Sequence, residues 1–472
     1  MNNFTKKLDE YFNVTSKGSN IRTEITAGIA TFMTMSYILL VNSDLLQSAA
    51  TFNAIFIATA ISSIIGTLIM ALYARLPFAQ APGMGLNAFF IFAVIGGMGL
   101  SYGNALMVVL ISGFLFLILT IIGLREKIVT SIPESLKLAI PAGIGLFIAF
   151  IGLQNAGIIQ DNPATLVTLV KFSDIFTRDN PVAMHTAMSA LVALITFIII
   201  AVLSKKKIKG SILYGILAGS MLYYLFQLIM FRRIGMFMPD TGEIGKLRFT
   251  NPFSAFGEFF RHSFFKFSFK GLFDDGLNSV LTFITLVLSF AIVDMFDTIG
   301  TLVGTAKRAG MLREDGTIDN MKKALLSDSI ATVAGAALGT STVTTYVESS
   351  AGIAEGGKTG LTSLTVAVLF LIAMFFTPLA ALIPSAATSA ALIYVGVLMI
   401  SALSELDFYD PVVIAPAFVT LIGMPLTYSI SDGIGLGIIT YLVIMLITGK
   451  IKQINWITYI IAALFILKFF VL

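Results

Sequence analysis

The chain has 472 residues, of which 57% are hydrophobic and 12% carry a formal charge. A soluble globular domain carries roughly 25% charged residues, so this chain has too few to cover a folded surface in water. It contains no cysteine and has a net charge of +4. These values exclude a disulfide-stapled secreted protein, a cysteine-ligated metal protein and a nucleic-acid binder with a broad basic face. Apolar residues are too abundant for a disordered chain, and the remaining class is an all-α polytopic membrane protein.

The first twenty residues are polar and lack the apolar core of a cleavable signal peptide, so we expect the N-terminus to stay in the cytoplasm. Apolar runs long enough to span roughly 30 Å of hydrocarbon then recur almost to the end of the chain. Two of them, 79–98 and 340–356, are interrupted by proline, glycine, serine and threonine and are predicted to be broken spans. Continuous spans are predicted at 24–41, 52–74, 102–123, 138–154, 184–203, 210–231, 279–304, 324–339, 361–377, 386–402, 411–428, 431–448 and 454–471.

Two segments are less clear than the rest. The last run, 454–471, either crosses the bilayer or lies against its surface, so the total is about fourteen crossings. The connection at 232–275 is mixed, and its phenylalanine-rich part with Arg261, Lys266 and Lys270 is predicted to lie at the membrane interface. His262 in that connection is interpreted as a surface side chain and not as a metal ligand.

Lysine and arginine orient these spans, because cytoplasmic loops carry an excess of both. If each broken stretch counts as one crossing, one side of the membrane receives residues 1–22 with four such residues, 125–137 with three, 205–209 with four and 307–323 with five. The opposite connections carry none at 42–50, none at 99–101 and two at 155–183. The asymmetry predicts a cytoplasmic N-terminus and supports both broken spans.

A weak internal echo joins the two halves of the chain. Ala58–Gly66 leads into the first broken stretch, and the similar run Ser327–Gly335 leads into the second. Paired interrupted segments at corresponding places in two halves indicate the binding site of a secondary transporter. Seven spans duplicated in inverted orientation fit the count, and chance similarity between two helices rich in small residues is the alternative.

Three acidic residues lie inside predicted spans, where a charge is costly and needs an explanation. Asp294 and Asp297 occur late in the 279–304 span, and their spacing of three places both on one helical face. Glu348 lies in the second broken stretch, together with the candidate contact Thr345. A buried carboxylate can exchange a proton or accept hydrogen bonds from a neutral ligand. Alternatively, these acids cap helices or pair with a lysine near the interface.

The first broken stretch offers backbone and amide groups. Gly83 and Gly85 permit backbone geometry that is unusual within a span, and a half-helix with free N–H groups is predicted to begin beyond them. Asn87 supplies both a donor and an acceptor. Tyr37 in the first span and Phe89 are candidates to stack on a flat ligand, although aromatic side chains in membrane helices commonly serve packing alone.

One motif matches the phosphate-binding P-loop pattern, Gly352-Ile-Ala-Glu-Gly-Gly-Lys-Thr359. A P-loop domain needs a parallel sheet buried by helices, and no polar segment here is long enough to build one. We therefore predict that its glycines form the turn between the broken span and the next helix. Lys358 would mark the cytoplasmic end of that turn.

Four stretches together resemble the AzgA-type adenine/guanine/hypoxanthine permeases of the nucleobase–cation symporter class. The resemblance runs from about Ile21 to the C-terminus, and the stretches follow in the right order: 23–38, 81–90, 294–302 and 348–360. Lys358 stands where arginine is more usual in this class. That departure leaves the resemblance intact.

The resemblance implies the fourteen-helix fold of uracil and xanthine permeases, with segments 3 and 10 built as a short strand joined to a half-helix. It implies a cytoplasmic tail at 1–21, a core domain at 22–135 and 276–384, and a gate domain at 136–275 and 385–472. It also implies that Asp294, with Asp297 as a rival, and Glu348 hold the base and carry the coupled proton, with Asn87 as a polar group of the third segment. Homodimers are usual in this fold.

The prediction is a multi-pass transporter of the cell membrane that imports adenine, guanine or hypoxanthine with protons by alternating, elevator-like access. It needs no cofactor besides the proton gradient, no metal, no nucleotide hydrolysis and no nucleic acid, and it is not an enzyme. Sodium coupling, another nucleobase or a small anion remain alternatives within the same fold. A channel should keep downhill flux without the acids, and an ATP-driven pump should depend on Lys358.

Overall fold

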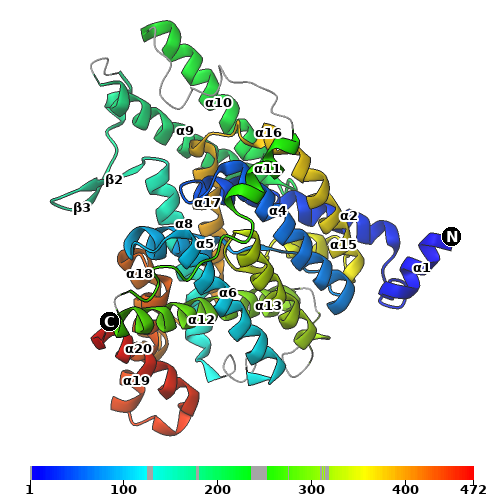
Figure 1. Ribbon diagram of the computed structural model, residues 1–472, viewed down its shortest axis with the longest axis vertical. Helices are drawn as coiled ribbons and strands as arrows, with labels where there is room; N and C mark the ends of the chain where they lie inside the picture. The colour runs from blue at the N-terminus through cyan, green and yellow to red at the C-terminus, as the bar shows by residue number, and fades with distance from the viewer. Residues whose placement is uncertain are drawn as a thin grey trace.

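Helices account for almost all of this protein, because backbone inside a bilayer must satisfy its own hydrogen bonds. The computed structural model describes residues 3–124, 131–176, 180–234, 252–274, 276–308, 311, 313 and 318–471. In Figure 1 the chain runs from the short helix α1 at the right, through a central bundle, to α19 and α20 at the lower left.

The element order is as follows. The first half contains α1 (Asn3–Phe12), α2 (Ile21–Met35), α3 (Ile38–Leu46), α4 (Phe52–Ile69), η1 (Met70–Ala74), β1 (Gln80–Pro82), α5 (Met84–Ala88), η2 (Phe89–Gly97), α6 (Tyr102–Ile121), α8 (Glu134–Asn155), β2 (Ile159–Asn162), β3 (Leu166–Leu169), η3 (Phe172–Phe176), α9 (Pro181–Lys205) and α10 (Ser211–Ile234). The second half contains α11 (Pro252–His262), α12 (Leu277–Arg308), α13 (Met321–Leu338), β4 (Val343–Thr345), α14 (Ser349–Ala354), α15 (Gly360–Ala373), η5 (Met374–Phe376), α16 (Thr377–Ala380), α17 (Ser385–Ile400), η6 (Ser401–Glu405), α18 (Pro411–Thr427), α19 (Ile430–Ile447), η7 (Ile451–Gln453) and α20 (Trp456–Val471).

Within the described part of the chain, ten helices are long and apolar enough to cross a membrane. They are Ile21–Leu46, Phe52–Ala74, Tyr102–Ile121, Glu134–Asn155, Pro181–Lys205, Ser211–Ile229, Leu277–Ala306, Gly360–Ala380, Ser385–Glu405 and Ile430–Ile447. The predicted spans at 324–339, 411–428 and 454–471 correspond to α13, α18 and α20, which are not among these ten. Helix α20 has 16 residues, roughly 24 Å of rise. The fold class is therefore confirmed, and the count of about fourteen crossings stays a prediction.

Both broken spans have the predicted construction of a short strand followed by a half-helix. Strand β1 pairs antiparallel with β4, with Gln80 opposite Thr345 and Pro82 opposite Val343. The chain then enters α5, which continues as η2, in the first break and α14 in the second. Antiparallel pairing of corresponding segments is the arrangement that an inverted repeat produces.

The outer edges of this two-strand ribbon are completed by two threonine hydroxyls. Thr67 of α4 accepts a hydrogen bond from the Gln80 N–H and donates one to the Gln80 carbonyl, both at 3.0 Å. Thr332 of α13 does the same for Val343, accepting from its N–H at 3.3 Å and donating to its carbonyl at 3.1 Å. Because an unpaired backbone group inside a membrane is costly, these side chains make strands possible at this depth.

The helices pack as two groups that meet around the ribbon. The core group consists of the core helices, α2 to α6 and α12 to α15, together with the strands β1 and β4, and its members contact one another. The gate helices are α8, α9, α10 and α17 to α20. Glycine permits the closest packing among the latter, since a Cβ on Gly396 of α17 would lie 2.4 Å from the Gly145 carbonyl oxygen of α8.

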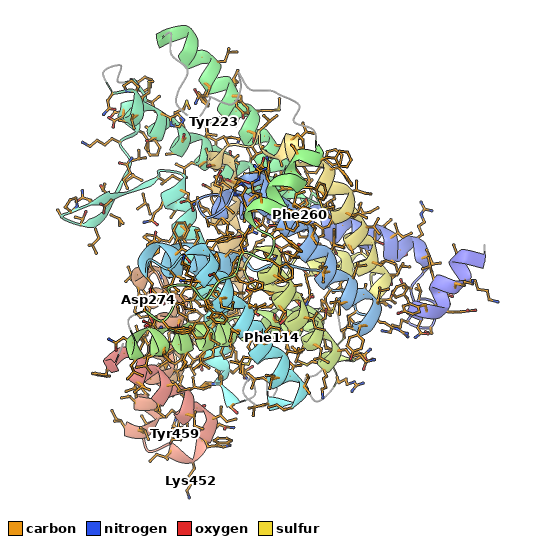
Figure 2. All side chains as sticks on the ribbon, viewed as in Figure 1. Phe114, Tyr223, Phe260, Asp274, Lys452 and Tyr459 are labelled. Atoms are coloured by element: carbon orange, nitrogen blue, oxygen red, sulfur yellow. The ribbon has the colours of Figure 1, made fainter. Side chains whose placement is uncertain are left out.

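The predicted domain boundaries stay predictions, although the element bounds locate them. The boundary at 135/136 falls in the first turn of α8, and the one at 384/385 coincides with the start of α17. Residue 275 lies outside the described residues. The interfacial segment predicted within 232–275 contains α11, which packs on α4, while 235–251 lie outside the described residues. Phe260 of α11 and Phe114 of α6 are exposed side chains suited to contact lipid (Figure 2).

Candidate functional site

A cavity of about 720 Å³ lies between the core helices and the gate helices. Its core wall comes from Tyr37, from Gly83 to Gly85, from the end of α12 and from Thr344 to Glu348; its gate wall comes from α8 and α17. The lining extends to Glu134 and Lys137 in the first turn of α8, to Thr305 near the end of α12, and to Glu405 beyond α17. The cavity therefore reaches from the broken spans to helix ends that adjoin the basic segments 125–137 and 307–323.

Glu348 lies on the cavity wall directly before α14 and is 8% exposed. Tyr37 donates a hydrogen bond from its hydroxyl to Glu348 Oε1 at 2.6 Å. Tyr37 is itself buried, in the short interruption that separates α2 from α3. The observed contact orients the Glu348 carboxylate, and the candidate role of Tyr37 in stacking on a ligand stays a prediction.

Asp297 is the second carboxylate that lines the cavity beside the β1–β4 ribbon. Thr344 of β4 donates a hydrogen bond to Asp297 Oδ2 at 3.3 Å. Gly83 lies beside both, because a Cβ on that residue would meet Thr344 Cγ2 at 2.4 Å and Asp297 Oδ2 at 3.5 Å. The end of β1, the strand β4 and helix α12 thus converge on one carboxylate.

Asp294 lies elsewhere on the same helix. It is fully buried, is not part of the cavity lining, and has Thr332 Oγ1 of α13 at 3.1 Å from its Oδ2. Residues three apart on an α-helix differ by about 60° in direction, which is enough to turn Asp297 to the cavity and Asp294 to α13. The sequence preferred Asp294 over Asp297, and the structure gives the cavity position to Asp297; the role of each stays a prediction.

Asn87 and Phe89 also lie behind the cavity wall. The fully buried Asn87 donates to Asn42 Oδ1 at 2.5 Å and accepts a hydrogen bond from Ser341. It therefore joins α5 to α3 and to the chain that enters β4. The ring of Phe89 packs on Phe290 of α12 with centroids 5.0 Å apart. Neither side chain is in the cavity lining.

Thr345 does line the cavity, and its hydroxyl accepts a hydrogen bond from Gln80 Nε2 at 3.3 Å across the ribbon. Two further residues at the site escaped the sequence analysis. Tyr346 lines the cavity and donates to the Pro82 carbonyl at 2.5 Å. Asp328 of α13 is fully buried and accepts a hydrogen bond from Thr298 at 2.6 Å. Asp328 lies in the repeated run 327–335, so an acid in that run was a signal available from the sequence.

The P-loop-like motif is a joint between helices. The buried carboxylate of Glu24 in α2 accepts hydrogen bonds from the N–H groups of Lys358 at 3.0 Å and Thr359 at 3.2 Å, and from the Thr362 hydroxyl at 2.6 Å. The backbone donors that would bind a phosphate in a P-loop thus bind a carboxylate of this chain. The preceding glycines form the turn between α14 and α15, as the sequence predicted.

The described residues contain no group of three or more histidine, cysteine, aspartate or glutamate side chains that could hold a metal ion.

Comparison with known proteins places almost the whole chain in one family. The sequence matches the Permease family over residues 22–434. It is 40% identical over 466 residues to the guanine/hypoxanthine permease PbuO of Bacillus subtilis, covering 98% of this chain and 100% of that protein. It is 36% identical over 470 residues to the adenine permease AdeQ of Escherichia coli, covering 99% and 97%. These relatives confirm the resemblance found in the sequence.

Solved structures show the same fold at low sequence identity. The transmembrane domain of the cyanobacterial bicarbonate transporter BicA superposes with a TM-score of 0.60 at 16% identity, covering 87% of this chain and 97% of that one. The structure of SLC26A9 superposes with a TM-score of 0.57 at 12% identity, covering 95% of this chain and 69% of that one.

Proposed function

The chain belongs to the Permease family, and from that premise we propose that it imports purine nucleobases through the cavity between its core and gate helices. The observation that carries the proposal is the pair of carboxylates, Asp297 and Glu348, on the wall of a largely apolar cavity beside the β1–β4 ribbon. The relatives named as guanine/hypoxanthine and adenine permeases support the substrate class.

The cavity groups match the edge of a purine. A planar base presents N–H donors and ring-nitrogen acceptors at fixed spacing, so carboxylates can accept from it while hydroxyls donate to it. Asp297 and Glu348 supply the acceptors. Thr344 and Thr345, which line the same cavity, supply the hydroxyls. Apolar side chains such as Phe296 and Ile144 face the same space and suit the faces of the ring.

Proton coupling is part of the proposal. Glu348 would take up a proton from outside and lose it inside, while Tyr37 holds the carboxylate toward the ligand through the 2.6 Å hydrogen bond. Asp297 is the second cavity carboxylate, and Asp294 remains a candidate that would act from behind the wall through Thr332. Sodium coupling is the alternative, and the uptake assay described below distinguishes it from proton coupling.

Transport would follow alternating access, with the core helices moving against the gate helices. In the state described here, the cavity reaches the ends of α8, α12 and α17 that adjoin the basic segments. Because basic loops face the cytoplasm, we assign this state as open to the inside, with the N-terminus cytoplasmic and the chain in the cell membrane. Lys452 in η7, between α19 and α20, projects from the lower tip of the molecule in Figure 2. A homodimer, implied by the resemblance, completes the proposal.

Uptake of radiolabelled adenine, guanine and hypoxanthine in purine-transport-deficient cells tests this function, with unlabelled uracil and bicarbonate as competitors. We expect purine accumulation that a protonophore abolishes and that removal of sodium leaves unchanged. Loss of purine accumulation when sodium is removed would identify sodium, and not the proton, as the coupling ion. Competition by bicarbonate alone would indicate an anion carrier. No purine uptake by a membrane-inserted protein would reject the proposal.

The same uptake assay distinguishes the roles of Asp297 and Asp294 and tests the role of the Tyr37 hydroxyl. Asp297→Asn should impair purine binding directly, whereas Asp294→Asn should act mainly through the stability of the α12–α13 contact. Tyr37→Phe, which keeps the ring and removes the hydroxyl, should lower uptake about tenfold because a hydrogen bond to a charged group is lost. Full uptake by Tyr37→Phe would show that the ring, and not the hydroxyl, is what the site uses.

A further inference from the structure

Asp44, at the end of α3, carries a contact between the two helix groups that the cavity does not use. Its Oδ1 accepts a hydrogen bond from the Ser385 hydroxyl at 2.9 Å, and its Oδ2 accepts one from the Thr388 hydroxyl at 2.7 Å. Asp44 belongs to a core helix, while Ser385 and Thr388 form the first turn of the gate helix α17. Gln47 also donates to Asp44 Oδ1, at 2.7 Å, and so fixes the carboxylate on its own side.

The first turn of α17 is a favourable place for this carboxylate. A helix N-terminus carries a partial positive charge and unpaired N–H groups, so an acid there is stabilised. Within α17 itself the residue before the first turn is Pro384, which makes no side-chain cap hydrogen bond. Asp44 supplies the negative charge from the other helix group, and two side-chain hydroxyls hold it there.

The two ends of α17 differ. At its N-terminal end the helix contacts α3, and Thr388 and Ala391 are buried. At its C-terminal end Val395, Leu398 and Met399 line the open cavity. Helix α17 is thus closed against the core at the end where the adjoining connections 47–51 and 381–384 carry no lysine or arginine. It is separated from the core at the end that adjoins the basic segments 125–137 and 307–323. A ring contact on the closed side, Phe92 of η2 with Tyr428 beyond α18 at 6.3 Å, supports the same description.

We propose that Asp44 is a latch that holds the outer side of the transporter closed, and that it must leave the first turn of α17 before the cavity can open outward. The inference rests on the alternating access proposed above. A charge-assisted hydrogen bond made in one state and absent in the other shifts the balance between the states by its full differential strength. Weakening the latch therefore populates the outward-open state.

The natural absence of cysteine allows a direct test. Ala391→Cys places one thiol on the closed face of α17, one turn beyond Thr388, where it is buried while the latch is formed. Its labelling by a membrane-impermeant maleimide from outside, without purine, reports opening of the outer side. Asp44→Asn in that background should raise the labelling rate about tenfold, and Asp44→Ala by more.

Two matched variants control for loss of charge and loss of a contact between the groups. Asp410→Asn removes an aspartate that caps its own helix, α18, through Val412 N–H at 2.9 Å, without crossing between the groups. Lys209→Ala removes an exposed ion pair between the groups, in which Lys209 Nζ lies 2.7 Å from Glu355 Oε2. Lys209 belongs to the basic segment 205–209. Both should leave Ala391→Cys labelling at the parental rate. Equal labelling in Asp44→Asn and its parent, or an equal rise with Asp410→Asn, would overturn the latch.

A cross-link tests the same contact with its own folding control, because uptake by the reduced double-cysteine protein shows that this variant folds. Cysteines at 44 and 388 should form a disulfide that stops uptake and is reversed by reduction. Uptake that continues with the disulfide formed would also overturn the proposal. Labelling of Ala391→Cys is read without substrate, so it does not depend on the transported molecule. A latch response in a protein that shows no purine uptake would reject the proposed function alone, and purine uptake without a latch response would reject this inference alone.

Discussion

The two broken spans share one plan but contribute different groups to the cavity. Each is a strand of the β1–β4 ribbon, completed on its outer edge by a threonine. The first gives the cavity Gly83, Met84 and Gly85, and turns its polar side chain, Asn87, away into a buried network. The second gives it hydroxyls and the Glu348 carboxylate. The first break therefore supplies shape and backbone, and the second supplies the polar side chains.

The half-helices differ in the same sense. Met84–Gly97 forms a continuous helical stretch after the first strand, whereas α14 after the second has 6 residues. The long half-helix reaches through the core and packs its aromatic residues there, as Phe89 does on Phe290. The short one ends soon after Glu348, at the turn that Glu24 holds. The two breaks thus share a backbone arrangement, while the polar side chains of the cavity are concentrated in the second.

The largest effect expected from this difference belongs to the second break. Glu348→Gln should reduce purine accumulation roughly 30-fold or more, because the buried carboxylate that accepts the Tyr37 hydrogen bond and would carry the proton is lost, while the protein still reaches the membrane. Asn87→Ser in the first break should instead reduce the amount of folded protein. Glu10→Gln, on the exposed surface of α1, is the matched control. Full uptake by Glu348→Gln would remove the contrast between the two breaks.

The next effect probes the shape of the first break. Gly83→Ala adds a methyl group 2.4 Å from Thr344 Cγ2, and overpacking of this kind costs about 1–3 kcal/mol. We expect uptake to fall about tenfold, with a raised apparent KM, because β4 and the Asp297 contact must shift. Gly257→Ala, in α11 where an added Cβ meets nothing within 4 Å, should behave as the parent. An unchanged KM in Gly83→Ala would mean that the close contact does not shape the site.

A smaller effect compares the two threonines. Thr67→Val and Thr332→Val keep the shape and each remove the hydroxyl that pairs with two backbone groups, at about 1–3 kcal/mol for each unsatisfied group. Thermal inactivation in detergent should show both losses. Thr332→Val should be the more damaging, because that hydroxyl also lies 3.1 Å from Asp294 Oδ2. Thr440→Val, on an exposed helix face, is the control, and equal losses would show that Asp294 does not depend on Thr332.

The smallest effect is expected at the P-loop-like turn. Lys358→Ala removes a single exposed hydrogen bond, from Nζ to the Gly18 carbonyl at 3.3 Å, and a surface change of this kind stays within about 0.5 kcal/mol. Purine uptake should be normal. Loss of uptake, with folded protein in the membrane, would instead support transport driven by nucleotide hydrolysis.

Much of the fold could be predicted because the bilayer simplifies the physics. Hydropathy located the spans, and proline, glycine, serine and threonine located the two breaks, while the family resemblance implied the strand and half-helix at each. The side-chain directions within those elements were harder. The sequence preferred Asp294 over Asp297, whereas the rotation of α12 in the fold turns Asp297 to the cavity and Asp294 to Thr332 of α13. For Tyr37 the sequence offered stacking on a ligand or packing alone, because nothing local to it indicates Glu348, which is 311 residues away.

The sequence by itself determined that this protein lives in a membrane, where it breaks its spans, and which family it resembles, because apolar length, proline, glycine and rare charges act locally. The tertiary structure alone decided which acid faces the cavity, which hydroxyl holds Glu348, and which carboxylate joins α3 to α17. Those contacts connect residues tens to hundreds of positions apart, and their geometry is set by how helices rotate and pack against one another. No pattern along the chain records that rotation.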